Sequence, residues 1–109
     1  MKKKVFISLL VSLLFLSACT SQQNQIHKII TLEILKKEVI NKEVQLIDVR
    51  TPDEYNAGHI DDAVNINISD RNEFKKAAEK LDKNRPVYLY CKAGVRSNKA
   101  SKLLQKMGF

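Results

Sequence analysis

The sequence predicts an α/β domain in which helices cover both faces of a parallel sheet. Apolar, β-branched runs alternate along the chain with segments whose apolar residues recur at helical spacing. The run "VQLIDV" (44–49) is apolar apart from one polar interruption and an acid near its end, as expected of a buried parallel strand. A chain of 109 residues has room for one small domain at most.

The first elements of this domain follow a polar stretch of the chain. Residues 26–30 are predicted as a short first strand. Thr31 then offers an N-cap to a helix over 32–40, where apolar residues recur at helical spacing. Residues 44–49 form the next predicted strand, and its acid, Asp48, comes near the end.

The segment "TPDEYNAG" (51–58) predicts a short helix with a defined start and end. Thr51 is a suitable N-cap, and Pro52 fits the first helical position. Glu54 stands three residues after Thr51, which is the spacing of a capping box. Gly58 is expected to end the helix.

The second half of the domain continues the alternation. Residues 63–68 alternate in polarity and predict a strand, after which Ser69 or Asp70 caps an amphipathic helix. The strongest strand prediction is "VYLYC" (87–91), because this run is β-branched, aromatic and unbroken. A last amphipathic helix is expected to start near Ser97, with Gly108 following it.

The N-terminal residues predict an export signal rather than part of the domain. Lysines at positions 2–4 precede an apolar run over 5–16, which is short of the roughly 20 residues of a membrane span. The following "LSAC" resembles the lipobox of bacterial lipoproteins, which implies that residues 1–18 are removed and that Cys19 is acylated. Residues 19–25 would then be a lipidated end and a polar tether. The alternative is a short buried helix.

Charge and composition argue against a nucleic-acid partner. The formal net charge is +7, but three of the lysines belong to the expected signal. Aromatic residues make up 6% of the chain, whereas single-stranded nucleic acids are bound on aromatic platforms. We therefore expect no nucleic-acid partner. The expected lipidation of Cys19 would hold the protein on the extracytoplasmic side of a membrane.

The loop "YCKAGVRS" (90–97) carries the candidate chemistry. If lipid occupies Cys19, Cys91 is the only free thiol of the mature chain, so it is either a buried apolar filler or a reactive group. Free amides at a helix start, together with the charges of Lys92 and Arg96, favour a thiolate. Gly94 permits the turn that curls a short loop around the sulfur.

Two blocks of the sequence resemble rhodanese-like sulfurtransferases. "CKAGVRS" is similar to the active-site loop of that family, and "LIDVRTPDEYNAGHIDDAVNI" (46–66) is similar to a second block of it. The matching residues of the second block are Asp48, Val49, Arg50, Glu54, Tyr55, Gly58, His59, Ile60, Ala63, Asn65 and Ile66. The resemblance covers residues 26–109 and implies a rhodanese-like domain.

The resemblance implies covalent sulfur transfer without a cofactor or metal. Cys91 would take a sulfane sulfur from a small anionic donor such as thiosulfate, and pass it to an acceptor such as cyanide or a thiol. The loop residues would bind the substrate. These residues are Lys92, Ala93, Gly94, Val95, Arg96 and Ser97.

The sequence departs from the family in two places. The family usually has a glycine at the position of Asp62, which we expect to alter only the turn. The family also continues with another strand, a loop and a closing helix after the helix that follows the cysteine loop. We therefore expect a domain without its last strand and helix, whose strand over 87–91 has an unpaired edge.

The remaining polar residues of the two blocks are interpreted as structural support. Asp48 and Arg50 are expected to form an ion pair at a strand end. Glu54 is accounted for by its role in the capping box with Thr51. His59 is interpreted as a structural residue rather than a catalytic base. From residue 83 onward there are seven basic residues and no acids, which predicts either a solvated helix face or a positive approach for anionic donors or an anionic membrane.

Two other functions remain open. A cysteine-loop phosphatase or arsenate reductase is the first, although those enzymes have five residues between cysteine and arginine, and here four separate Cys91 from Arg96. The second is a non-catalytic, membrane-anchored module that binds sulfur or docks a protein partner, whose identity the sequence does not give.

Overall fold

A computed structural model describes residues 27–109 of the chain. The expected signal (1–18), the lipidation of Cys19, the tether (19–25) and Ile26 lie outside the described residues. No helix within 27–109 is both long enough and apolar enough to cross a membrane.

The sheet is parallel throughout, as the sequence predicted. Its three strands are β1 (Gln45–Asp48), β2 (Val64–Asn65) and β3 (Val87–Tyr90). β1 lies between the other two, and its last residue, Asp48, is paired with the last residues of both neighbours. The carboxyl ends of all three strands therefore meet at one edge, where sites form in open α/β sheets.

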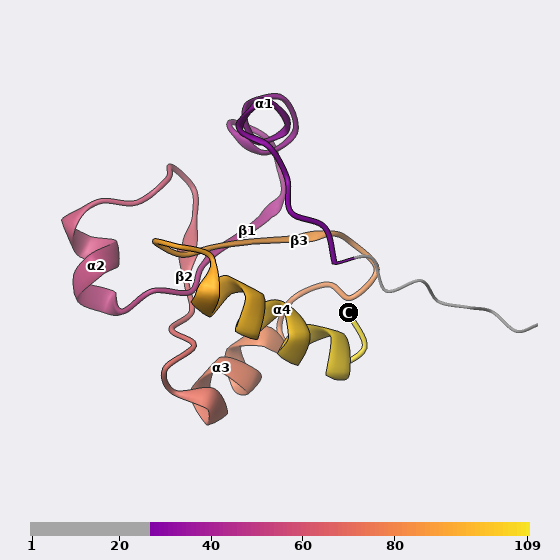
Figure 1. Ribbon diagram of the computed structural model, residues 1–109. Coiled ribbons are helices and arrows are strands. Elements are labelled where there is room, and N and C mark those ends of the chain that lie inside the picture. The colour runs from indigo at the N-terminus through magenta and orange to yellow at the C-terminus, as the bar shows by residue number, and fades with distance from the viewer. Residues whose placement is uncertain (1–26) are drawn as a thin grey trace, which may run out of the picture.

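Helices cover both faces of the sheet, which confirms the predicted α/β class (Figure 1). The helical elements are α1 (Leu32–Ile34), the π-helical turn η1 (Leu35–Val39), α2 (Pro52–Ala57), α3 (Arg71–Ala78) and α4 (Val95–Lys106). In Figure 1, α3 and α4 lie together on one side of the sheet, and α1 lies on the other. One apolar cluster fills each side.

The two apolar clusters are built from opposite faces of β1. On the α3 and α4 side, Ile47 packs with Phe74 of α3 and with Leu104 of α4, all of them buried. On the other side, Leu46 packs with Val39 and Ala63. Because successive side chains of a strand point to opposite faces, a continuous apolar run serves both clusters.

The predicted helix caps are present. The hydroxyl of Thr51 accepts a hydrogen bond from the Glu54 amide at 3.3 Å, and the Glu54 side chain in turn accepts one from the Thr51 amide at 3.4 Å. Asp70, rather than Ser69, caps α3 by accepting from the Glu73 amide. Thr31 caps α1 in the same way.

Three sequence predictions differ from the structure. Residues 27–30 do not form the expected first strand, because no strand of the described sheet lies beside them, and Ile29 is 89% exposed. The strand predicted over 63–68 is limited to β2, although the Ile66 and Ile68 amides still donate to carbonyls of β1 and Val49. The last helix begins at Val95 and not near Ser97.

The early start of α4 follows from the conformation of Gly94. This residue is the N-cap and has a φ of 86°, in the left-handed region that glycine adopts without strain. The chain therefore turns directly from the cysteine loop into the helix. At the other end, Gly108 follows α4 with a φ of 94°, as expected of a C′ residue.

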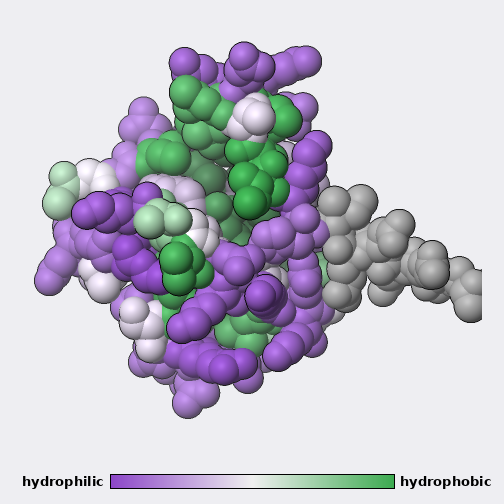
Figure 2. All heavy atoms as spheres, in the orientation of Figure 1, coloured by the Kyte–Doolittle hydropathy of each residue, from purple (hydrophilic) through white to green (hydrophobic). Residues whose placement is uncertain are grey.

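β3 forms one edge of the described sheet. Within residues 27–109 its only strand neighbour is β1, so the opposite edge of β3 carries no strand of the described sheet. Figure 2 shows hydrophobic side chains gathered around α1 and the sheet face beneath it, whereas hydrophilic side chains dominate over α3 and α4.

Candidate active site

Cys91 lies at the carboxyl end of β3, in a loop that folds back on the sulfur. The Gly94 amide donates to Cys91 Sγ at 3.1 Å, and the Ser97 amide donates to it at 3.3 Å. Both donors come from the start of α4, where backbone N–H groups have no partner within the helix. The cysteine is half-buried, so its sulfur combines a fixed set of donors with access from solvent.

The Ser97 side chain adds a second contact to the sulfur. Its Oγ lies 3.5 Å from Cys91 Sγ and donates to the Gly94 carbonyl at 3.1 Å. In the thiol form, the S–H group donates to this hydroxyl oxygen. When the thiol loses its proton, rotation of the hydroxyl lets it donate to the thiolate instead.

These contacts lower the pKa of Cys91 to about 7 from an ordinary value of 9.0. Burial acts in the opposite direction and raises it, but the Ser97 hydroxyl and the backbone amides of Ser97, Ala93 and Gly94 together lower it further. A pKa near 7 means that the nucleophilic thiolate is well populated at neutral pH, unlike an ordinary cysteine. The expected thiolate site is thus made mainly of backbone and hydroxyl donors.

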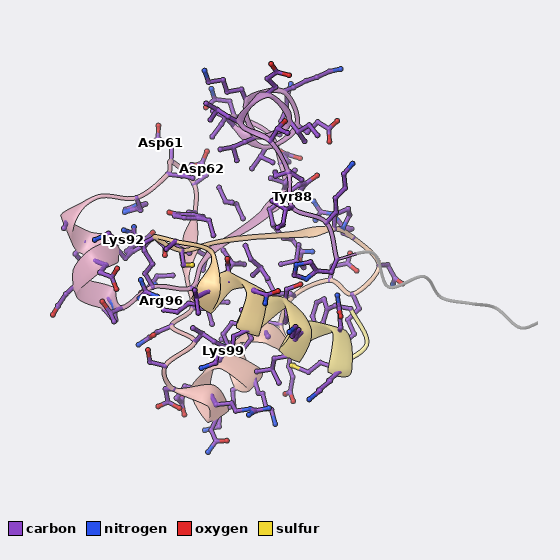
Figure 3. All side chains as sticks on the ribbon, viewed as in Figure 1. Asp61, Asp62, Tyr88, Lys92, Arg96 and Lys99 are labelled. Atoms are coloured by element: carbon purple, nitrogen blue, oxygen red, sulfur yellow. The ribbon has the colours of Figure 1, made fainter. Side chains whose placement is uncertain are left out.

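The two charged residues of the loop have different surroundings. Lys92 is exposed, and Arg96, in the first turn of α4, forms a bidentate ion pair with Glu54. This pair raises the pKa of Arg96, and the nearby Cys91 charge contributes in the same direction. Figure 3 shows Arg96 at the start of α4 and Lys99 one turn further along the helix.

The Arg96–Glu54 ion pair was not predicted from the sequence. Its two residues are 42 positions apart and were assigned separately, Arg96 to substrate and Glu54 to its cap. The cap is present, but Glu54 also joins α2 to the cysteine loop. The hydrogen bonds from Arg96 and Thr51 outweigh burial and lower the pKa of Glu54 to about 2.

Asp48 and Arg50 form the ion pair expected at the strand end. Arg50 Nη2 donates to Asp48 Oδ2 at 2.6 Å and to the Gly58 carbonyl at 2.7 Å. Burial raises the pKa of Asp48, but hydrogen bonds from Arg50 outweigh it, and the pKa is lowered overall. The pair therefore links the end of β1 to the end of α2.

His59 is held against α2. Its ring stacks on Tyr55 with centroids 3.7 Å apart, and its Nδ1 lies 2.8 Å from the Tyr55 carbonyl oxygen. Among the contacts of the described residues, none joins His59 to Cys91. Tyr90, to which the sequence pointed only as a strand residue, accepts from the Ile60 amide through its hydroxyl at 3.0 Å and braces the same turn.

The cysteine loop is surrounded by hydrogen-bond donors rather than by metal ligands. Within residues 27–109, no three His, Cys, Asp or Glu side chains come together in a way that could hold a metal ion. The hydrogen-bond partners of Cys91 Sγ include the Gly94 and Ser97 amides and the Ser97 hydroxyl. This set of donors suits an anionic sulfur.

Comparison with known proteins places this geometry in a family. The model of the family described as "Rhodanese-like domain" matches residues 31–109, and the chain belongs to that family. A crystal structure of a rhodanese-like domain protein from Staphylococcus aureus is similar, with a TM-score of 0.60 and 32% identity over 71% of this chain and 72% of that one.

Relatives within this family have more than one activity. The chain is 40% identical over 63 residues to the thiosulfate sulfurtransferase PspE of Escherichia coli, covering 58% of this chain and 60% of PspE. It is 35% identical over 89 residues to a tRNA uridine(34) hydroxylase of Pelagibacter ubique, covering 82% of this chain and 30% of the hydroxylase. The chain thus spans less than two thirds of either relative.

Proposed function

We propose that this chain is a sulfurtransferase that carries sulfane sulfur as a persulfide on Cys91. The observation that supports this most directly is the pair of backbone amides 3.1 and 3.3 Å from Cys91 Sγ, which favour an anionic sulfur without any base. The similarity to a thiosulfate sulfurtransferase supports thiosulfate as the donor.

The reaction takes place in two displacements at sulfur. The Cys91 thiolate attacks the outer sulfur of thiosulfate, the sulfur–sulfur bond of the donor breaks, and sulfite leaves with the electron pair. The product is a persulfide anion on Cys91. Cyanide then attacks the outer sulfur of that persulfide, and thiocyanate leaves while the Cys91 thiolate is regenerated. A thiolate acceptor would become a persulfide in the same way.

The loop residues would act on the anionic species of both steps. The Gly94 and Ser97 amides point at the sulfur, where negative charge resides, and hydrogen bonds to an anionic sulfur are stronger than those to a neutral one. Lys92 is exposed beside this loop and would attract the donor. Arg96 would contribute its charge while Glu54 holds it in place.

We further propose that a lipid on Cys19 anchors the domain on the extracytoplasmic side of a membrane. The support is the sequence "LSAC" after an apolar run and a lysine cluster. The polar residues after Cys19 would separate the domain from the bilayer. The active site would then meet donors and acceptors outside the cytoplasm.

Formation of thiocyanate from thiosulfate and cyanide tests the proposed activity. The full chain should produce it, and Cys91→Ser should abolish it, because a hydroxyl supplies almost no anion at neutral pH. Arg96→Ala should weaken the use of thiosulfate and keep the reactive thiol, whereas Lys75→Ala, at an exposed position of α3, should leave the rate unchanged. Activity that survives Cys91→Ser would contradict the proposal.

A further inference from the structure

A cleft of about 450 Å³ lies between the start of α3 and the exposed side of α4. Arg71 lines it from α3, and Arg96, Lys99, Lys102 and Lys106 line it from α4. No acidic residue lines it. The proposed sulfur-transfer chemistry uses only Arg96 of this set, so the remaining four cations have no role in it.

Most of these cations are available to a ligand. Within residues 27–109, Arg71, Lys99, Lys102 and Lys106 form no ion pair with a carboxylate, whereas Arg96 is paired with Glu54. Several like charges around one concave surface raise the local positive potential and favour an anionic occupant. Ile68 and Leu103 also line the cleft, so an occupant with an apolar group gains contact there.

The cations of α4 form a line that leads away from the cysteine loop. Arg96, Lys99 and Lys106 are spaced by three and seven residues and lie on one side of the helix. From Arg96 to Lys106 this line extends about 15 Å, at 1.5 Å per residue. Figure 3 shows its start, with Arg96 beside the loop that carries Cys91 and Lys99 farther along α4.

From these features we infer that the cleft binds an acidic peptide segment, with an apolar side chain, of a partner protein that exchanges sulfur with Cys91. The length of the line exceeds that of a small anion, and its concave shape suits a peptide better than a flat bilayer. The chain's own N-terminal stretch is a poor occupant, because residues 1–26 contain lysines and no acids. The sulfur exchange rests on the proposed function, whereas the binding does not.

Binding of a synthetic peptide to the full chain tests this inference. The probe is a fluorescein-labelled peptide of about six residues, glutamates around one leucine, which spans roughly 20 Å when extended. A matched peptide carries glutamines in place of the glutamates. The double variant Lys102→Glu, Lys106→Glu reverses two charges of the cleft. Its control, Lys36→Glu, Lys37→Glu, makes the same change in net charge on η1, outside the cleft.

The glutamate peptide should bind and the glutamine peptide should not. The cleft variant should weaken binding about tenfold or more, and the η1 control should change it less than about twofold. Equal weakening by both variants would overturn the inference, since only general charge attraction would remain. Binding should be the same for Cys91→Ser, so a chain without sulfurtransferase activity can still confirm or overturn the cleft assignment.

Binding to lipid vesicles shows whether the cleft contacts a membrane rather than an acidic peptide. Phosphatidylglycerol and phosphatidylcholine vesicles are compared with both double variants, because the N-terminal apolar stretch could itself bind lipid. If the cleft variant reduces binding to phosphatidylglycerol vesicles more than the η1 control does, and the glutamate peptide does not bind, the cleft is a membrane contact and the inference is wrong. If the cleft variant weakens binding of the glutamate peptide more than the η1 control does, and the two variants bind vesicles equally, the inference is confirmed.

Discussion

Arg96 and Glu54 form a bidentate ion pair that joins the cysteine loop to α2. Arg96 Nη1 lies 2.6 Å from Glu54 Oε1, and Nη2 lies 2.9 Å from Oε2. Glu54 also completes the cap of α2 with Thr51. One carboxylate therefore fixes the start of a helix and the guanidinium next to the nucleophile, so the position of Arg96 depends on the folding of a distant segment.

Glu54→Gln should separate these two roles. Glutamine can still complete the capping box, but it forms no ion pair. The pKa of Glu54 is about 2 in the folded chain against an ordinary 4.5, so its stabilisation is complete above about pH 4.5 and is lost as pH falls through 2. Urea unfolding should show Glu54→Gln to be less stable than the parent at pH 7, with the difference shrinking toward pH 2.

A matched control uses an exposed ion pair. Glu73 pairs with Lys76 at 3.1 Å, but both side chains are more than 60% exposed, and such pairs contribute little. Glu73→Gln should therefore leave the urea midpoint nearly unchanged across the same pH range. If the gap between Glu54→Gln and the parent does not depend on pH, the ion pair does not stabilise the fold in the way proposed.

Ser97→Ala should raise the pKa of the Cys91 thiol. The hydroxyl is the largest of the groups that lower this pKa to about 7, so its removal should move the value toward 9.0. The first unit of increase above 7 leaves about fivefold less thiolate at pH 7, and a second unit leaves about tenfold less again. The rate of iodoacetamide alkylation against pH measures the shift. Ser101→Ala, one turn farther along α4, should not move the inflection. An inflection near 9 in the parent chain would contradict an activated thiolate.

Asp48→Asn should destabilise the domain by about 3 kcal/mol, the low end for breaking a buried ion pair, because the Arg50 side chain keeps 17% exposure and can reach water. Asp48 itself is fully buried. Urea unfolding of Asp48→Asn, Arg50→Gln and the double variant gives the coupling between the two residues. Additive effects of the single variants would show that the pair is not coupled.

Local patterns in the sequence were sufficient for much of the fold. The capping box at Thr51 and Glu54 depends only on residues three positions apart, and the Asp48–Arg50 pair on residues two apart. The position of Cys91 at a strand end followed from the apolar run before it. Each of these features is fixed within a few residues, so its signal is present in a short segment.

Features that depend on distant segments could not be predicted in this way. Residues 27–30 have the composition of a strand, but a strand forms only where a neighbour offers its hydrogen bonds, and none does in the described sheet. The Arg96–Glu54 pair needs α2 to lie beside the start of α4. The pKa of Cys91 depends on amides whose direction is set by the left-handed turn at Gly94.

Cys19→Ala should leave the precursor without lipid and move it from the detergent phase to the aqueous phase. This prediction rests on "LSAC", since Cys19 is the residue that the lipobox resemblance places at the mature N-terminus. Detergent phase partitioning of the expressed chains measures this change. Cys91→Ser is the control, because it also removes a thiol but leaves Cys19 in place. Equal partitioning of Cys19→Ala and the parent chain would show that the lipobox interpretation is wrong.

Mass spectrometry of the full chain after exposure to thiosulfate tests the sulfurtransferase proposal most directly. The account predicts a gain of about 32 Da on Cys91, one sulfur held as a persulfide. Cyanide should then remove this mass and release thiocyanate, and Cys91→Ser should show neither step. A folded chain that gains no sulfur on Cys91, and that instead hydrolyses phosphate esters, would contradict the account and assign the loop to a phosphatase.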